Sequence, residues 1–288
     1  MKYPEIKVMD NNPSLEGLAR VVPDIVYSKP DGQELKLTLM LPWSQEQENA
    51  PALPLVVFLQ GSAWTHPDIY YEIPQLCQLA RDGYAVATIE HRNSMEGHPY
   101  PAYLQDSKTA IRFLRANAPK YGIDPERVCF FGTSSGGNTA LLVGITGDDE
   151  RLKTDEYREY SDAVKLVVEC FGPTDMAAMV DGMSKEEAEQ TWGELIRALA
   201  GKNSIEDVLK WMSPVEHVRP GAEYPPFLII HGDADTLVPY EQSVKMYRKL
   251  IDCGADARMI CIKGAPHEGS FWSRELISEI FDYIRRRL

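Results

Sequence analysis

The chain has 288 residues, 44% of them hydrophobic and 25% charged, which is long enough for one α/β domain with a substantial core. Its 43 acidic and 30 basic residues give a net charge of −13, which repels nucleic acids and anionic membrane surfaces. Neither is expected as a partner.

The N-terminal segment carries Pro4, Glu5 and Asp10 where a signal peptide needs an apolar run. No stretch of the chain approaches the roughly 20 apolar residues of a membrane span. We therefore expect a soluble, cytoplasmic protein. A chain from which a leader had been removed would look the same and would be secreted.

Strand patterns begin with residues 24–28 and 34–42, which flank the turn sequence KPDG and predict an antiparallel pair. Six later runs are short, β-branched and apolar enough to be buried on both faces, as in a parallel sheet. These runs are residues 53–59, 84–90, 127–132, 164–172, 226–232 and 257–264.

Helix patterns lie between these runs, at residues 74–82, 102–117, 138–145, 240–253 and 271–287. Strands that alternate with helices over this length predict a mostly parallel sheet with helices on both faces and right-handed connections.

One interval, at about residues 173–224, lacks a strand pattern. It contains two helix-like segments, 184–201 and 204–212, for which Ser184 and Ser204 are expected N-caps. We interpret it as a cap-like helical insertion over one end of the sheet.

Five cysteines are widely spaced, mostly in apolar surroundings, and form neither a CxxC motif nor a cluster with histidine. We expect reduced core cysteines and no zinc site. They are Cys77, Cys129, Cys170, Cys253 and Cys261.

The candidate nucleophile lies in the sequence GTSSG, where a strand pattern runs into a helix pattern. In open α/β sheets this is where ligands bind. A turn this tight excludes a Cβ two residues before and two residues after the nucleophile. Ser134 satisfies that demand with Gly132 and Gly136, whereas Ser135 would place Thr133 in one of the two positions. The N–H of Ser135 opens the helix and can donate to an oxyanion.

A serine hydroxyl needs a base, and the base needs an orienting acid. The loop after 226–232 offers Asp233 and Asp235, and the loop after 257–264 offers His267. Of the six histidines, only His267 follows a late strand in a glycine-rich loop. His231 is its strongest rival in position, and we expect its ring to hold the local loop by hydrogen bonds.

Together these motifs resemble the α/β-hydrolase superfamily, in particular esterases related to hormone-sensitive lipase and to bacterial feruloyl and acetyl xylan esterases. The matching segments are FLQGSAW (58–64), GTSSGGN (132–138), IIHGDADTLVPYEQS (229–243) and GAPHEGSF (264–271). The resemblance implies a single α/β-hydrolase domain over residues 1–288.

The resemblance also assigns roles. The order serine, acid, histidine and the pattern H-G-x-x-D select Asp235 as the acid beside Ser134 and His267. Asp233 is then expected to cap the turn, and Glu268 to lie at the surface.

The segment QGSAW replaces the HGGGW of the family, which implies that the N–H groups of Ser62 and Ala63 join that of Ser135 in an oxyanion hole. A buried ion pair between Arg92 and Asp106 is expected to support nearby loops.

The expected reaction is hydrolysis of a carboxylic ester through an acyl-enzyme, with no metal or organic cofactor. The substrate is a small-molecule or carbohydrate ester; the resemblance favours short acyl or hydroxycinnamoyl esters of plant carbohydrates. Candidate pocket residues are Trp64, Met176, Met179, Trp192 and Leu195. A peptidase of the prolyl oligopeptidase type and a non-catalytic binding protein with the same fold remain alternatives. The sequence assigns no oligomeric state.

Overall fold

The computed structural model describes residues 6–11, 13–46, 50–180 and 183–288. In this part of the chain the sheet contains eight strands: β1 (Ala19–Ser28), β2 (Leu35–Pro42), β3 (Leu53–Leu59), β4 (Ala85–Ile89), β5 (Ile123–Thr133), β6 (Leu166–Cys170), β7 (Phe227–Gly232) and β8 (Ala257–Ile262). Their spatial order is β1-β2-β4-β3-β5-β6-β7-β8. The pairs β1–β2 and β2–β4 are antiparallel, and all later neighbours are parallel, as predicted.

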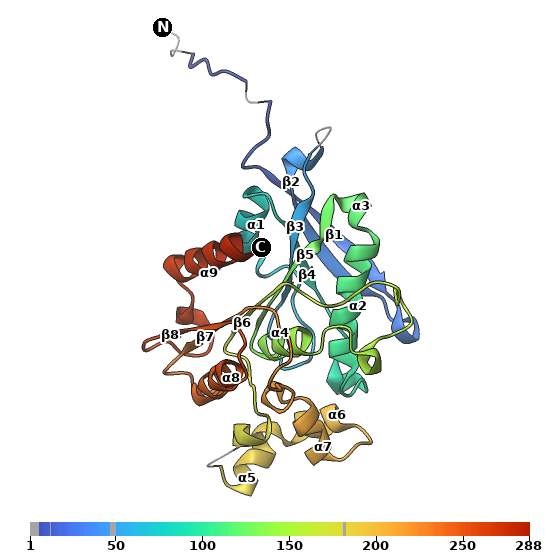
Figure 1. The fold of residues 1–288 in the computed structure, drawn as a ribbon, viewed down its shortest axis with the longest axis vertical. Coiled ribbons are helices and arrows are strands. Elements are labelled where there is room, and N and C mark those ends of the chain that lie inside the picture. The colour runs from blue at the N-terminus through green and yellow to red at the C-terminus, as the bar shows by residue number, and fades with distance from the viewer. Residues whose placement is uncertain (1–5, 12, 47–49, 181–182) are drawn as a thin grey trace, which may run out of the picture.

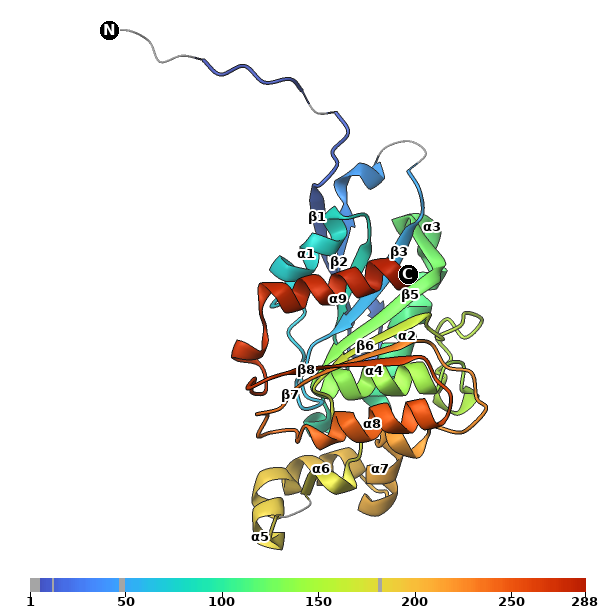
Figure 2. The same ribbon diagram turned by 60° about the vertical axis from the view of Figure 1, so that its left-hand side comes forward.

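Helices cover both faces of the sheet (Figures 1 and 2). One face packs against α2 (Ala102–Ala116), α3 (Ala118–Tyr121), α4 (Ser135–Ile145) and α8 (Glu241–Asp252), and the other against α1 (Ile73–Arg81) and α9 (Arg274–Arg287). Both faces are apolar because alternate residues of a strand point to opposite sides. In β3, Val57 joins the first core and Phe58 the second. None of the described helices is long and apolar enough to cross a bilayer.

Between β6 and β7 the chain forms α5 (Lys185–Ala188), a π-helical turn (Glu189–Gly193), α6 (Glu194–Ala200) and α7 (Ile205–Trp211). These helices gather at one end of the molecule (Figure 1). Ser184 forms a capping box with Glu187, as its sequence position predicts. Ser204 occupies the N-cap of α7, as predicted, although its side chain makes no capping hydrogen bond.

The predicted cysteine environments are partly wrong. All five cysteines are free, and Cys129 and Cys170 are buried in the sheet. Cys77 and Cys253 are half-buried, however, and Cys261 is exposed. Cys261 lies on β8, which is an edge strand with a neighbour on one side only.

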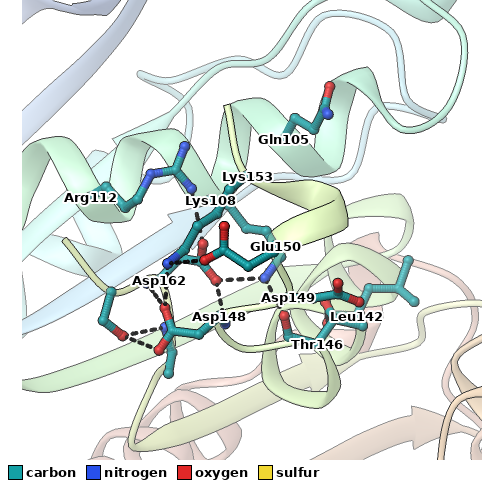
Figure 3. A network of polar contacts seen from close by, with 12 residues as sticks. Gln105, Lys108, Arg112, Leu142, Thr146, Asp148, Asp149, Glu150, Lys153 and Asp162 are labelled. Atoms are coloured by element: carbon teal, nitrogen blue, oxygen red, sulfur yellow. Dashed lines mark hydrogen bonds and ion pairs between the residues drawn. The ribbon is translucent and has the colours of Figure 1, made fainter. Parts of the chain in front are cut away.

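A fully buried ionic network joins α2 to the loop before β6 (Figure 3). The carboxylate of Asp162 accepts hydrogen bonds from Lys108 Nζ at 2.7 Å and from Arg112 Nη1 at 2.9 Å. It also accepts the backbone N–H of Asp148 at 2.9 Å. None of the three charged side chains is accessible to solvent. Removing the anion would leave two cations uncompensated in a low-dielectric interior.

We predict that Asp162→Asn lowers the free energy of unfolding by about 3 kcal/mol, because the two cations lose their counter-charge. Urea denaturation measures this loss. Glu150→Gln is the matched control. Glu150 is 64% exposed and pairs with Arg158 and Lys153, so its replacement should cost only about 0.5 kcal/mol. Equal effects of the two substitutions would contradict the importance of the buried network.

Candidate active site

Ser134 lies on a strained turn between β5 and α4, with φ 51° and ψ −122°. The turn is tight on both sides. A Cβ on Gly132 would lie 1.9 Å from the carbonyl oxygen of Gly136, and a Cβ on Gly136 would lie 2.2 Å from that of Leu59. Such contacts are impossible, so the turn requires glycine at both positions. The two glycines flank Ser134, and not Ser135, at the apex of the turn.

The structure brings the three predicted side chains together. His267 Nε2 lies 3.0 Å from Ser134 Oγ, and His267 Nδ1 lies 2.7 Å from Asp235 Oδ2. The serine follows β5, the aspartate β7 and the histidine β8. They meet because the carboxyl ends of parallel strands share one edge of the sheet. With Nδ1–H assigned as the donor to Asp235, Nε2 is free to accept the proton of Ser134.

Asp235 is held as an anion. Its side chain is inaccessible to solvent, and Oδ1 accepts the N–H groups of Leu237 at 2.8 Å and Val238 at 2.9 Å. Burial raises the pKa of the Asp235 carboxyl, but hydrogen bonds from two histidines and from a backbone N–H outweigh burial and hold this pKa well below its usual value. The carboxylate can therefore orient and stabilise a charged imidazole.

One aromatic ring packs against the imidazole of His267. The ring of Phe171 lies 4.6 Å from it and packs edge-on against Phe271, also at 4.6 Å. Phe171 adopts a left-handed backbone conformation, φ 44°, directly after β6. These contacts restrict rotation of the imidazole between its two partners.

The expected oxyanion hole needs a correction. The N–H of Ser62 donates to Ser135 Oγ at 2.9 Å, so it is not available to a ligand. Ser135 thus holds the segment 61–64 through its hydroxyl, a role that the sequence did not predict. Ala63 lines the cavity next to Ser134, and the N–H of Ser135, first residue of α4, has no acceptor within the helix. The N–H groups of Ala63 and Ser135 therefore remain as candidates for the oxyanion hole.

His231 and Asp233, the other histidine and aspartate near the site, have hydrogen-bond partners of their own. The ring of His231 bonds to Ser243 and Val238, which holds the local loop as expected, and also to Asp235. Asp233 does not cap its own turn but accepts the N–H of Gly264, because the loops after β7 and β8 lie side by side.

Glu268 was expected at the surface and is instead half-buried. Its backbone has φ 62°, and its carboxylate accepts the indole N–H of Trp272 at 3.0 Å. The ion pair between Arg92 and Asp106 is present, with Arg92 Nη2 at 2.8 Å from Asp106 Oδ1.

An apolar cavity of about 210 Å³ opens beside Ser134. Its wall contains all the pocket residues that the sequence suggested: Trp64, Met176, Met179, Trp192 and Leu195. Four of these come from the segment between β6 and β7, so this segment forms much of the wall. Trp192 lies in the π-helical turn, and its buried Nε1 has no hydrogen-bond partner among the described residues.

Residues 39–250 match the family model named BD-FAE. The chain belongs to the BD-FAE family. Esterase LipC of Mycobacterium tuberculosis is 30% identical to it over 213 residues, which make up 72% of this chain and 51% of LipC. Isoprenylcysteine alpha-carbonyl methylesterase ICME of Arabidopsis thaliana is 25% identical over 266 residues, 90% of this chain and 60% of ICME. This BD-FAE chain spans about half the length of the curated relatives it matches.

Two solved structures are similar to this BD-FAE member. A truncated form of a carbohydrate esterase from gut microbiota has a TM-score of 0.77 and 30% identity, covering 96% of this chain and 98% of that one. A bifunctional GH43-CE protein of Bacteroides eggerthii has a TM-score of 0.78 and 29% identity. The match covers 93% of this chain and 35% of that one. The expected α/β-hydrolase fold and the relationship to esterases of that superfamily are confirmed.

Glu169 is a fully buried carboxyl on β6 that was not among the predicted site residues. Its Oε2 accepts the N–H of Gly172 at 2.9 Å, and Ser243 Oγ donates to its Oε1 at 3.2 Å. Burial raises the pKa of Glu169 to about 7, although these hydrogen bonds and His231 oppose the rise. The sequence feature that could have identified this carboxyl is a single glutamate in the apolar run LVVEC.

We predict that Glu169→Gln changes how stability depends on pH. A carboxyl whose pKa is about 7 in the folded protein and near 4.5 when unfolded stabilises the fold fully below pH 4.5 and loses this effect as pH rises through 7. The unfolding free energy of the wild type, minus that of the variant, should therefore fall by on the order of 2 kcal/mol between pH 5 and pH 8. Denaturant titrations across this range measure it, and a difference that stays constant or rises would contradict the assignment.

Proposed function

We propose that the protein is a serine carboxylic ester hydrolase. The observation that carries this proposal is the continuous hydrogen-bond chain from Ser134 through His267 to Asp235, at the side of an apolar cavity. The relatives and the similar structure are named as esterases, which supports the proposal.

In the proposed reaction, Ser134 Oγ attacks the ester carbonyl while His267 Nε2 takes its proton. The N–H groups of Ala63 and Ser135 receive the negative charge that develops on the carbonyl oxygen. His267 returns the proton to the leaving alcohol, which leaves an acyl group on Ser134. A water molecule, deprotonated by His267, then releases the acid.

We further propose that residues 1–288 act as one catalytic domain and that the segment 173–224 is the cap that shapes the acyl site. Asn138 on α4 ties this segment to the Ser134 turn, because its amide donates to Pro173 O and Met212 O at 2.8 Å each. An apolar cavity of about 150 Å³ can hold a benzene ring, so about 210 Å³ suits a short acyl chain or one aromatic ring with a small substituent.

The proposed substrates are short acyl or hydroxycinnamoyl esters of plant carbohydrates. The similar structure that is named a carbohydrate esterase supports this choice. Hydrolysis of ethyl ferulate, acetylated xylan and tributyrin, measured side by side, tests it. Aminoacyl p-nitroanilides test the peptidase alternative, and faster cleavage of these amides than of p-nitrophenyl esters would contradict the proposal.

We predict that Ser134→Ala lowers kcat on p-nitrophenyl acetate by about 10⁴-fold or more, because the nucleophile is removed. Ser135→Ala should lower it only about 10-fold, through loss of the hydrogen bond that holds the N–H of Ser62. The two variants are matched in chemistry and adjacent in the chain. Residual activity that is higher in Ser134→Ala than in Ser135→Ala would reverse the assignment.

We also predict that Met179→Trp shifts the preference toward shorter acyl groups, because Met179 is 7% exposed and lines the cavity. On a series of p-nitrophenyl esters, kcat/KM for butyrate should fall by about 10-fold relative to acetate. Met183→Trp serves as the control: Met183 is 41% exposed and is not among the cavity-lining residues. An unchanged ratio in Met179→Trp would exclude this cavity as the acyl site.

A further inference from the structure

We propose that His231, Ser243 and Glu169 form a buried positioning network that holds Asp235 in place for the reaction. This inference rests on the proposed function. The three residues lie on β7, α8 and β6, and their side chains are buried. They extend the hydrogen-bond chain from Asp235 into the interior, on the side away from Ser134.

The bonds of His231 settle which of its nitrogens carries a proton. Its Nε2 lies 3.1 Å from Asp235 Oδ2 and 2.9 Å from the carbonyl oxygen of Val238. Both of these groups only accept, since Asp235 is ionised, so Nε2 must be a donor whether the ring is neutral or charged. Asp235 Oδ2 therefore receives N–H groups from two imidazoles, those of His231 and His267.

The other side of His231 contacts a hydroxyl that bridges two titratable groups. Ser243 Oγ lies 2.7 Å from His231 Nδ1 and 3.2 Å from Glu169 Oε1. In one arrangement Glu169 is protonated and donates to Ser243, which donates to a neutral Nδ1. In the other, Nδ1 carries the proton and donates to Ser243, which donates to an ionised Glu169. The two arrangements hold the same number of protons and the same net charge.

Both arrangements leave the Nε2–H of His231 directed at Asp235. The network therefore holds the catalytic carboxylate through the same N–H group in either arrangement. Three other titratable groups of the described chain lie close to these residues. His267 is on the second side of Asp235, the ring of Tyr240 lies 5.9 Å from that of His231, and the thiol of Cys170 is buried next to Glu169 on β6.

Removing the Nε2–H should change His267 through Asp235. A carboxylate that shares its oxygen with one donor instead of two stabilises a charged imidazole more strongly. We expect His231→Leu to raise the pKa of His267 by on the order of 0.5, as read from its imidazole NMR signals in the free protein. The less firmly held Asp235 should also lower kcat on p-nitrophenyl butyrate by about 10-fold with KM within twofold.

Two further variants separate positioning from packing. His231→Gln keeps an N–H donor near the place of Nε2, so it should restore kcat to within about threefold of the wild type. His91→Leu is the matched control. His91 is 2% exposed, packs near the ring of Tyr103 and, within the described part of the chain, forms a side-chain hydrogen bond only to the backbone oxygen of Arg92. It should change stability while the pKa of His267 stays constant. If His231→Leu does not fold, His231→Phe provides the same comparison.

An unchanged pKa of His267 in the donor-free variant, or equal losses in kcat for His231→Leu and His231→Gln, would overturn the network. The NMR titration needs no turnover, so this outcome is distinct from failure of the proposed function. That failure would appear as a wild type without Ser134-dependent ester hydrolysis.

Discussion

The backbone at Ser134 is the constraint on which the rest of the site depends. A non-glycine residue at φ 51° and ψ −122° is strained by roughly 1–3 kcal/mol and persists only where its surroundings hold it. The N–H of Ser134 donates to Cys170 O at 2.9 Å, and its carbonyl accepts the N–H of Asn138 at 3.0 Å. Because β6 and α4 both hold this turn, the hydroxyl stays at the sheet edge where His267 can reach it.

The polar side chains around the Ser134 turn have specific hydrogen-bond partners. Asp235 receives four donors and remains charged, which suits a group that must orient an imidazole. Ser135 supports the oxyanion segment rather than competing with Ser134. In the wall of the apolar cavity, in contrast, the indole nitrogens of Trp64 and Trp192 are buried without a hydrogen-bond partner among the described residues.

Much of this arrangement could be predicted from sequence because it follows from local rules. The alternation of apolar strands with helices defined the sheet, and the glycine spacing around Ser134 followed from steric exclusion. The engagement of Ser62 by Ser135 could not be predicted, since it joins residues 73 positions apart through loops whose path depends on tertiary packing. Ser204 occupies the predicted N-cap position, but residue type alone does not show whether the hydroxyl bonds to the helix, and here it does not. Glu169 could be noticed in the sequence as a single charged residue in an apolar strand. Its role could not be predicted, because it interacts with Ser243 on α8 and His231 on β7.

The central claim is that Ser134 is activated by His267. An aryl phosphonate ester reacts with an activated serine to leave a stable adduct, which peptide mass spectrometry locates. The account predicts a single adduct on Ser134 that forms at least 100-fold more slowly in His267→Ala. An adduct on Ser135, or modification of Ser134 at the same rate without the histidine, would contradict it.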